Sequence, residues 1–308
     1  MSLMRSALLW ASTNPFMVQR LPRMGFVQRA SRRFMPGEEP ADALREAERL
    51  GARGAPTLVT LLGENLENEA EAGAVVTHYV GLLDEIRKRG LDMELSIKLT
   101  QLGLDLSVEL ARDGLRELLR AAGDSMVWID MESSAYVDTT LGLFRALRED
   151  NENVGVCLQA YLRRTAADVE ALVPLKPAIR LVKGAYREPP DVAFPRKATV
   201  DATYRQLASQ LLRHAAADRV GRVGIATHDA RLIRDAQTRA HELALDPSRW
   251  EVEMLFGIGR AEQDRLLRSE TRLRVLVSYG AHWFPWYMRR LAERPANVWF
   301  VVRKMAGR

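Results

Sequence analysis

The stretch "AIRLVKGAY" (178–186) decides the fold expected for this chain. Its apolar run is rich in β-branched and leucine side chains, too short for an ordinary helix, and followed by a glycine, which is typical of a buried strand. Alternation along a strand places Arg180, Val182 and Gly184 on one face and Lys183 on the other. An arginine in the middle of a buried strand indicates that this face of the sheet carries polar groups.

Seven more runs share this character, and the segments between them carry apolar residues at spacings of three and four, as helices do. The eight runs are 57–62, 93–98, 126–130, 154–159, 178–183, 222–227, 250–256 and 273–278. Strands that alternate with helices form parallel, right-handed crossovers, and eight such units close a barrel. The pattern predicts an α/β fold of the (β/α)₈ TIM-barrel type.

A doubly wound open sheet is the main alternative fold. It usually has a glycine-rich turn after the first strand, whereas the segment after 57–62 offers one glycine. The "GIGR" sequence at 257–260 follows the seventh run and lacks a third glycine, so we interpret it as a turn. We predict a helical arm over 1–50 and one barrel domain over 51–308 that ends in a C-terminal helix.

Composition narrows the class of protein. Of the 308 residues 47% are hydrophobic, enough for a substantial core. The net charge of +5 comes from interspersed basic and acidic residues without a nucleic-acid-binding motif, so we expect no nucleic-acid partner. No apolar stretch has the length of a membrane span. The single cysteine, Cys157, excludes an intramolecular disulfide and, within "VGVCLQ", predicts a buried, inert thiol.

The N-terminus is basic, with six arginines and no acidic residue before Glu38. This composition resembles a mitochondrial transit peptide. An amphipathic helix that packs on the domain, or that touches an anionic membrane surface, is the competing interpretation. Pro15 and Pro22 interrupt any long helix. We favour a helical extension over a mitochondrial targeting segment. We therefore expect a cytoplasmic protein, and peripheral contact with the inner membrane stays open.

Polar residues gather where the predicted strands end, the face on which barrel enzymes place their chemistry. They include Lys98, Asp130, Gln159, Lys183, Thr227 and His228. Arg180 inside a barrel needs an anionic or strongly polar partner. That partner is either Asp130, in a structural ion pair, or a cofactor with electron-rich acceptor atoms. The five histidines lack metal-ligand spacing and no GxSxG motif occurs, so we expect neither a metal site nor a serine hydrolase.

A resemblance to a known family extends these inferences. The motifs "SIKLT", "IDMES", "LQAYLRRT", "IRLVKGAY", "ATHD", "MLFGI" and "WFPWYMRRLAERPAN" occur in the order found in compact, monofunctional bacterial proline dehydrogenases. The resemblance runs from about Arg33 to the C-terminus. It implies a distorted (β/α)₈ barrel with N-terminal helices, noncovalently bound FAD, and oxidation of L-proline to Δ1-pyrroline-5-carboxylate. It also implies a quinone-type electron acceptor and at least transient membrane contact.

The same resemblance implies roles for individual residues. Lys98, Arg289 and Arg290 would bind the substrate carboxylate, and Glu293, one helical turn later, would orient both guanidinium groups. Asp130 and Arg180 match catalytic residues, with Arg180 also near the flavin N5. Further matches to cofactor contacts are Met131, Gln159, Lys183, Gly184, Ala185, Thr227 and His228. The substrate ring would lie among Tyr186, Leu255, Leu276 and Tyr287.

Two positions depart from the family pattern and leave the substrate open. The family usually reads "RVYVPYG" where this chain reads "RVLVSYG", so Leu276 replaces a tyrosine and Ser278 a proline. Relatives that prefer hydroxyproline also lack this tyrosine, although a smaller polar residue replaces it. The alternative substrate is therefore hydroxyproline or another cyclic secondary amino acid. An alternative of another class, a noncatalytic flavin- or proline-binding protein, is disfavoured because every charged residue of the expected site is present.

Overall fold

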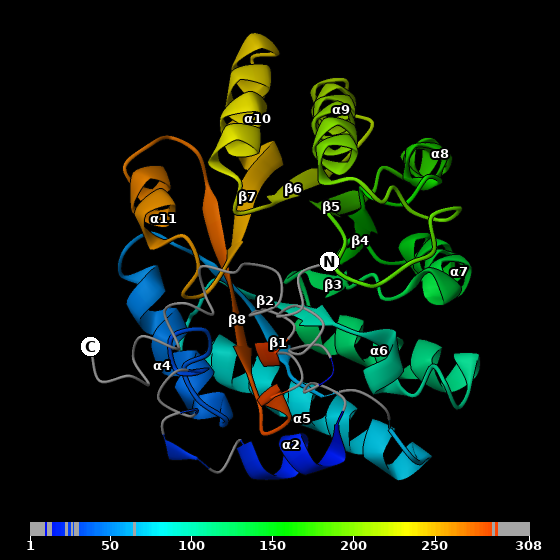
Figure 1. Cartoon of the computed structure of the whole chain (residues 1–308), viewed down its shortest axis with the longest axis vertical. Helices are drawn as coiled ribbons and strands as arrows, with labels where there is room; N and C mark the ends of the chain where they lie inside the picture. Colours follow the sequence, from blue (N-terminus) through cyan, green and yellow to red (C-terminus); the bar gives the residue numbers. More distant parts are fainter. Residues whose placement is uncertain are drawn as a thin grey trace.

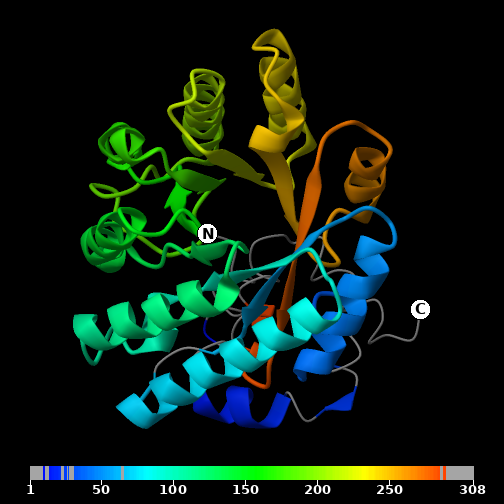
Figure 2. The ribbon, with the colours of Figure 1, turned by 180° about the vertical axis from the view of Figure 1, so that it is seen from behind.

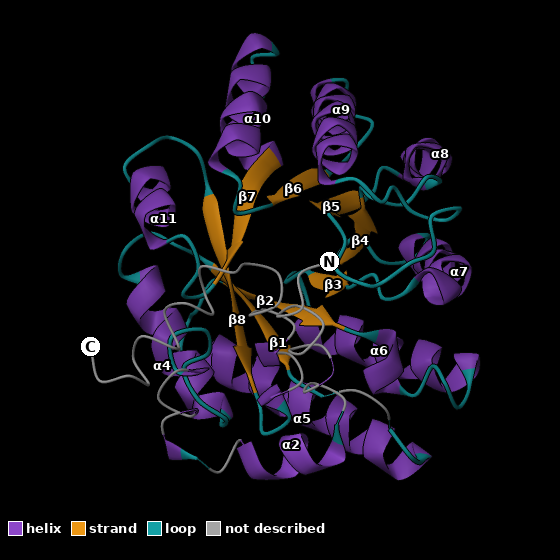
Figure 3. Ribbon diagram, viewed as in Figure 1, coloured by secondary structure: helices purple, strands orange, loops and turns teal. Residues whose placement is uncertain are grey.

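The computed structural model describes residues 10, 14–21, 24–25, 27, 31–63, 66–284 and 287–288. Eight parallel strands close into a barrel in sequence order, with β1 hydrogen-bonded to β8 (Figure 1, Figure 3). The strands are β1 (Thr57–Leu61), β2 (Met93–Ile97), β3 (Val127–Ile129), β4 (Val154–Gln159), β5 (Ala178–Val182), β6 (Arg222–Ala226), β7 (Trp250–Leu255) and β8 (Leu273–Tyr279). The predicted barrel is confirmed, and no predicted strand end is wrong by more than one residue.

Helices surround the barrel and cover the outward faces of the strands (Figure 1). They are α2 (Pro15–Arg20), α4 (Pro40–Gly51), α5 (Glu69–Lys88), α6 (Val108–Ala122), α7 (Val137–Arg148), α8 (Thr165–Leu172), α9 (Lys197–Ala216), α10 (Ala230–Glu242) and α11 (Arg260–Leu267). Helices α5 and α6 run side by side, as the view from behind shows (Figure 2). Helix α4 packs against β1 and β8, where the barrel closes.

Local sequence explains the helix boundaries, as α6 illustrates. The Ser107 hydroxyl accepts a hydrogen bond from the Leu110 N–H at 3.2 Å and caps the first turn. Gly123 follows the last helical residue with a positive φ of 59°. Between them Ala111, Leu115 and Leu118 recur at helical spacing and are fully buried. The helix therefore has one apolar face, which it buries against its neighbours.

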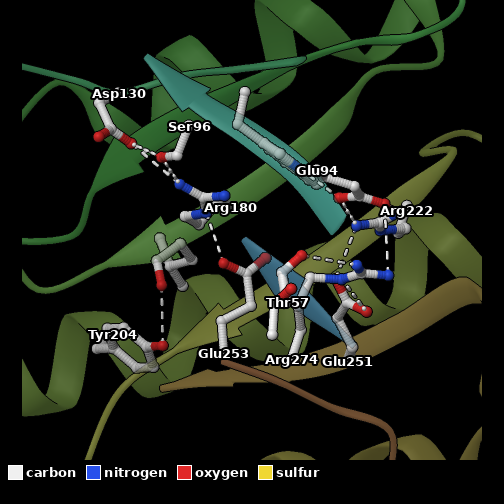
Figure 4. A network of polar contacts seen from close by, with 12 residues as sticks. Thr57, Glu94, Ser96, Asp130, Arg180, Tyr204, Arg222, Glu251, Glu253 and Arg274 are labelled. Carbon is white, nitrogen blue, oxygen red and sulfur yellow. Dashed lines mark hydrogen bonds and ion pairs between the residues drawn. The ribbon is translucent and has the colours of Figure 1, made fainter. Parts of the chain in front are cut away.

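The inner faces of the strands carry charge, which is unusual for a barrel core. At the N-terminal end of the barrel, Arg274 is 1% exposed, with its Nε 3.0 Å from Glu251 Oε1 and its Nη1 2.8 Å from Asp92 Oδ1. Arg222 donates to both oxygens of Glu94 at 2.8 and 2.6 Å (Figure 4). Buried charges are tolerated when each has a partner, and this network closes that end of the barrel with paired groups.

Trp128 separates this network from the charges nearer the C-terminal end. Its ring lies against the guanidinium groups of Arg180 and Arg222, whose Cζ atoms are 4.8 and 5.1 Å from the ring. Its Nε1 donates to Glu94 at 2.8 Å. Gly155 on the neighbouring strand leaves the space that the ring occupies, since a Cβ there would lie 2.5 Å from a Trp128 ring carbon. The indole therefore fills the centre of the barrel and contacts both levels of charge.

The described part of the N-terminal arm packs against the segment that follows β8. Phe34 and Met35 are buried in a cluster with Trp283 and Tyr287, separate from the main core. Glu38 accepts a hydrogen bond from Trp283 Nε1 at 2.8 Å. Within the described residues no helix has the length and apolar character needed to cross a membrane.

Cys157 behaves as its sequence context predicts. It is 4% exposed on β4 and forms no disulfide. Burial, the largest effect, raises the pKa of its thiol to about 12. The predicted burial of Cys157 is confirmed, and a thiol that stays protonated at neutral pH is a poor nucleophile.

Candidate active site

Arg180 is the centre of the polar site. It lies in the middle of β5, is 3% exposed, and points across the barrel toward residues of three other strands (Figure 4). Its Nη1 donates to Ser96 Oγ at 2.8 Å and to Asp130 Oδ1 at 3.0 Å. On the other side its Nε lies 2.6 Å from Glu253 Oε2. The expected ion pair between Arg180 and Asp130 is therefore present, and a second carboxylate accompanies it.

These neighbours keep Arg180 charged and fixed. Burial lowers the pKa of the guanidinium, but the carboxylates of Glu253 and Asp130 raise it by more, so the net shift is upward. Ser96 Oγ also donates to Asp130 Oδ1 at 2.8 Å, so a second side chain inside the barrel holds this carboxylate in place. The site thus offers a permanent, oriented positive charge surrounded by low-dielectric protein.

Met131 and Gln159 lie beside this charge at the ends of neighbouring strands. Gln159, the last residue of β4, is 2% exposed, and its Nε2 donates to the Met131 carbonyl at 3.1 Å. Among the described residues, neither Gln159 Oε1 nor Arg180 Nη2 has a hydrogen-bond partner, although both atoms are buried. A buried acceptor and a buried donor without protein partners suit a ligand that has both kinds of group.

The ends of β5 and β6 form a second polar group. Lys183 Nζ lies 2.5 Å from Asp201 and 3.4 Å from Asp229. Asp229 caps α10, and although burial raises its pKa, hydrogen bonds from Arg231 and the charge of Lys183 lower that pKa to about 2. Thr227 Oγ1 accepts from the Asp229 N–H at 3.2 Å. Lys183 is thus held by carboxylates on α9 and α10.

His228 links this group to β7. Its Nε2 lies 3.5 Å from the backbone N–H of Leu255, at the long limit of a hydrogen bond. Leu255 is half-buried and packs against the cluster that contains Tyr287. The structure therefore brings together a predicted cofactor contact and a residue predicted to line the substrate pocket.

The structure gives its own reason for a glycine at position 184, besides the one expected from the motif. Strand β5 ends at Val182, so the strand alternation that places Gly184 on the face of Arg180 does not extend to it, and that expectation is wrong. The φ of Gly184 is +108°, and a Cβ at this position would lie 2.2 Å from the Tyr161 ring. Both features require glycine. Ala185, which follows, is exposed.

The residues expected to enclose the substrate ring differ in their surroundings. Leu276 on β8 is half-buried and packs against Leu58 and Trp128 inside the barrel. Tyr287 is 1% exposed, with ring centroids 5.7 Å from Phe34 and 5.8 Å from Trp283. Burial raises the pKa of its phenol strongly, so the hydroxyl stays protonated. The remaining member, Tyr186, is half-buried in the loop after β5.

The carboxylate-binding set is only partly within the described chain. Lys98 directly follows β2 and is half-buried. Arg289, Arg290 and Glu293 lie outside the described residues. Their expected position is just beyond Met288, which is buried in the same cluster as Tyr287.

Sequence reasoning missed Ser96 and Glu253, which complete the surroundings of Arg180. A signal was present: in "WEVEML" strand alternation places Glu251, Glu253 and Leu255 on one face. Gly224 on the neighbouring strand makes room for Glu253, since a Cβ there would lie 2.2 Å from Glu253 Oε1. Within the described chain, no group of three or more His, Cys, Asp or Glu side chains is arranged to hold a metal ion.

Comparisons with known proteins identify the family. A family model described as proline dehydrogenase matches residues 43–303. Proline dehydrogenase 1 of Bacillus subtilis subsp. natto is 37% identical over 303 residues, which is 98% of each chain. The proline dehydrogenase of Deinococcus radiodurans is 35% identical over 312 residues and also covers 98% of both chains.

A solved structure shares the fold. Proline utilization A from Bdellovibrio bacteriovorus, inactivated by N-propargylglycine, superposes with a TM-score of 0.81 at 23% identity, over 94% of this chain and 36% of that longer one. The family match covers most of the chain, and the two relatives cover nearly all of it. The chain belongs to the proline dehydrogenase family.

Proposed function

We propose that this chain is an FAD-dependent dehydrogenase that oxidises L-proline to Δ1-pyrroline-5-carboxylate. The observation that carries the proposal is the buried Arg180 guanidinium, held between Asp130 and Glu253 inside a barrel of the proline dehydrogenase family. A purely structural ion network gives no reason for the hydrogen-bonding groups near it that have no partner in the described protein. A redox cofactor with donors and acceptors along its edge does give one.

The residues present fit such a cofactor. The edge of the isoalloxazine ring has carbonyl and ring-nitrogen acceptors and an N–H donor. These groups match Arg180 Nη2, a donor, and Gln159 Oε1, an acceptor, neither of which has a hydrogen-bond partner among the described residues. The chain would hold FAD through residues on, or directly after, four neighbouring strands, β3 to β6. These are Met131, Gln159, Arg180, Lys183, Gly184, Ala185, Thr227 and His228.

The roles of the chain's own side chains follow from charge and position. When bound, FAD supplies the two-electron acceptor for the hydride that leaves C5 of proline. Arg180 supplies a fixed positive charge where electron density increases, and Asp130 keeps that charge oriented. Lys98, Arg289 and Arg290 bind the substrate carboxylate, with Glu293 orienting the arginines. Water takes the proton released from the ring nitrogen.

Apolar and aromatic residues enclose the other side of the substrate. Tyr287 and Leu255 belong to or pack against one buried cluster at the barrel mouth. Tyr186 and Leu276 complete the set of side chains assigned to the ring. Holding the ring against the cofactor and away from water favours the reaction mainly through orientation.

The electrons then pass to a quinone-type acceptor, which requires transient contact with a membrane. The described arm supports this part of the proposal. Phe16 is 59% exposed and Trp10 56% exposed, and the Arg20 guanidinium lies 4.8 Å from the Phe16 ring. Exposed aromatic rings beside a basic group suit a shallow interaction with an anionic surface.

The test is the visible spectrum of the purified protein before and after anaerobic addition of L-proline. We expect flavin absorbance in the purified protein and loss of that absorbance with L-proline. A yellow protein that neither proline nor a related ring bleaches would support the noncatalytic binding protein instead. A colourless protein that takes up no added FAD would contradict the flavin-based function.

Leu276 supports a second candidate substrate. A leucine that packs with Leu58 and Trp128 presents methyl groups where a phenol would present a hydroxyl. A bulkier or less polar cyclic secondary amino acid would suit such a wall. The comparison is kcat/KM for L-proline, L-pipecolate and trans-4-hydroxy-L-proline with the wild type and with Leu276→Tyr. If the substitution leaves the order of preference unchanged, Leu276 does not select the substrate.

A further inference from the structure

The barrel interior contains two levels of charge with different balances. At the N-terminal level two buried carboxylates face two guanidinium groups, with the exposed Asp92 at the edge of the network, and at the upper level two carboxylates share one guanidinium group. The lower groups are Glu94, Glu251, Arg222 and Arg274, and the upper groups are Asp130, Glu253 and Arg180. Among these seven groups, the upper ones therefore carry one more negative than positive charge when both carboxyls are ionised, and the lower ones are balanced.

Glu253 is the upper carboxylate with the poorer set of partners. Its side chain is 4% exposed, its Oε2 is 2.6 Å from Arg180 Nε, and its Oε1 has no hydrogen-bond partner in the described chain. Asp130, in contrast, accepts from both Ser96 and Arg180 and is 23% exposed. An excess negative charge at this level is therefore most costly on Glu253.

Burial, the largest effect, raises the pKa of Glu253 to about 7. The negative charges of Glu251 and Glu94 contribute to this rise in pKa, while Arg180 and Arg222 oppose it. The lower carboxylate Glu94 shifts the other way: burial raises its pKa, but the nearby Arg222 and Arg274 bring the net shift downward. The two buried glutamates thus differ because their cation partners differ in number.

The other titratable groups around Glu253 do not change charge near neutral pH. Cys157 on β4 has a pKa raised to about 12, chiefly by burial. Burial also raises the pKa of Tyr204 on α9, whose hydroxyl donates to the Leu181 carbonyl. Arg274 on β8 lies opposite Glu253 of β7 in the strand register, and it remains charged because its pKa is raised. These three groups therefore keep their charge state when Glu253 takes up a proton.

We propose that Glu253 is a positioning residue for Arg180, and that it takes up a proton from water when an electron-rich ligand binds beside this guanidinium. The inference rests on the proposed function, which places the flavin edge there. While Glu253 is ionised, Arg180 is shared between two carboxylates. Once Glu253 is neutral, the upper level has no net negative charge, and Arg180 interacts more strongly with acceptor atoms of the ligand.

The consequence is a pH-dependent affinity for FAD. Because the protonated protein binds more tightly, affinity falls as pH rises through about 7. Full linkage to one proton with that midpoint weakens binding by about tenfold between pH 6 and pH 8. Glu253→Gln keeps the shape and an oxygen for Arg180 but removes the titration.

The experiment measures the dissociation constant of FAD for the apoprotein at pH 6 and pH 8, without substrate, by quenching of flavin fluorescence. We expect up to about a tenfold change for the wild type and less than about twofold for Glu253→Gln. Glu253→Asp retains a carboxyl and should retain the pH dependence. Glu242→Gln, the same chemical change at the exposed end of α10, should behave as wild type.

Thermal unfolding of the apoprotein provides a second readout. A carboxyl with a raised pKa in the folded state contributes stability that is complete below 4.5 and is lost as pH rises through about 7. The Tm of the wild type should therefore fall relative to that of Glu253→Gln between pH 5 and pH 8. A constant difference in Tm over this range would show that Glu253 does not titrate there, and would overturn the proposal.

The binding outcomes separate the two proposals. If wild type and Glu253→Gln bind FAD with parallel pH profiles, the proton linkage is wrong while the flavin-based function stands. If neither protein binds FAD at either pH, the proposed function is contradicted, and the ligand linkage of Glu253 with it.

Discussion

Gly184 is a residue at which backbone conformation and packing both restrict the choice of side chain. Its φ of +108° is unfavourable for any residue with a Cβ, and the Tyr161 ring occupies the place where that Cβ would lie. The residue stands at the start of the loop that follows β5, two residues beyond the strand's last residue, Val182. Backbone conformation and packing therefore act together next to the candidate site.

We expect Gly184→Ala to lower the free energy of unfolding by about 2 kcal/mol or more, because the backbone strain and the contact with Tyr161 both oppose it. Urea denaturation followed by circular dichroism measures the change. Gly81→Ala is the matched control, since Gly81 lies within α5 with open space around it and should gain roughly 0.5–1 kcal/mol. Equal effects at the two glycines would contradict this account.

At the scale of single elements, the strands were predictable and their inward partners were not. Short apolar runs flanked by polar segments placed every strand end within one residue, because buried parallel strands have few other ways to satisfy that pattern. The alternation in β7 indicated that Glu251 and Glu253 share a face. It did not indicate that Arg274 of β8 and Arg180 of β5 lie opposite them, since pairing across a barrel depends on closure.

The same limit applies to the candidate site. Asp130 and Arg180 were predictable as a pair because an arginine within a buried strand needs an anionic partner and Asp130 stands at the end of a neighbouring strand. Ser96 carries no charge and gave no such signal, although it donates to Asp130 and accepts from Arg180. The roles of Arg289 and Arg290 came from the family motif alone and stay predictions.

The network at the N-terminal ends of the strands has its own prediction. We expect Arg274→Met to lower the free energy of unfolding by about 3–5 kcal/mol, because it leaves the fully buried Glu251 without one of its two guanidinium partners. Arg205→Met removes an exposed pair with Asp235 on the outer helices and should cost less than about 1 kcal/mol. Chemical denaturation compares the two. Similar losses would show that the buried network contributes no more than a surface pair.

At the scale of the whole molecule, residues 34–38 of the arm pack against residues 283–288, which follow the last strand of the barrel. Phe34 from the arm packs against Tyr287 near the other end of the described chain, and Glu38 binds Trp283. The segment that continues from Met288 carries the proposed carboxylate-binding arginines. The arm therefore packs against Tyr287, which is proposed to line the substrate pocket. A change in the arm should affect substrate binding as well as stability.

We expect Phe34→Ala to raise the KM for the substrate several-fold with a smaller change in kcat, because the cavity left behind Tyr287 loosens the wall assigned to the substrate ring. It should also cost about 3–5 kcal/mol of stability, as large-to-small changes in a core do. Phe144→Ala is the control: Phe144 is equally buried, but lies in α7 in the main core. It should lose similar stability while KM stays the same. Equal KM values for the two variants would show that the arm does not influence substrate binding.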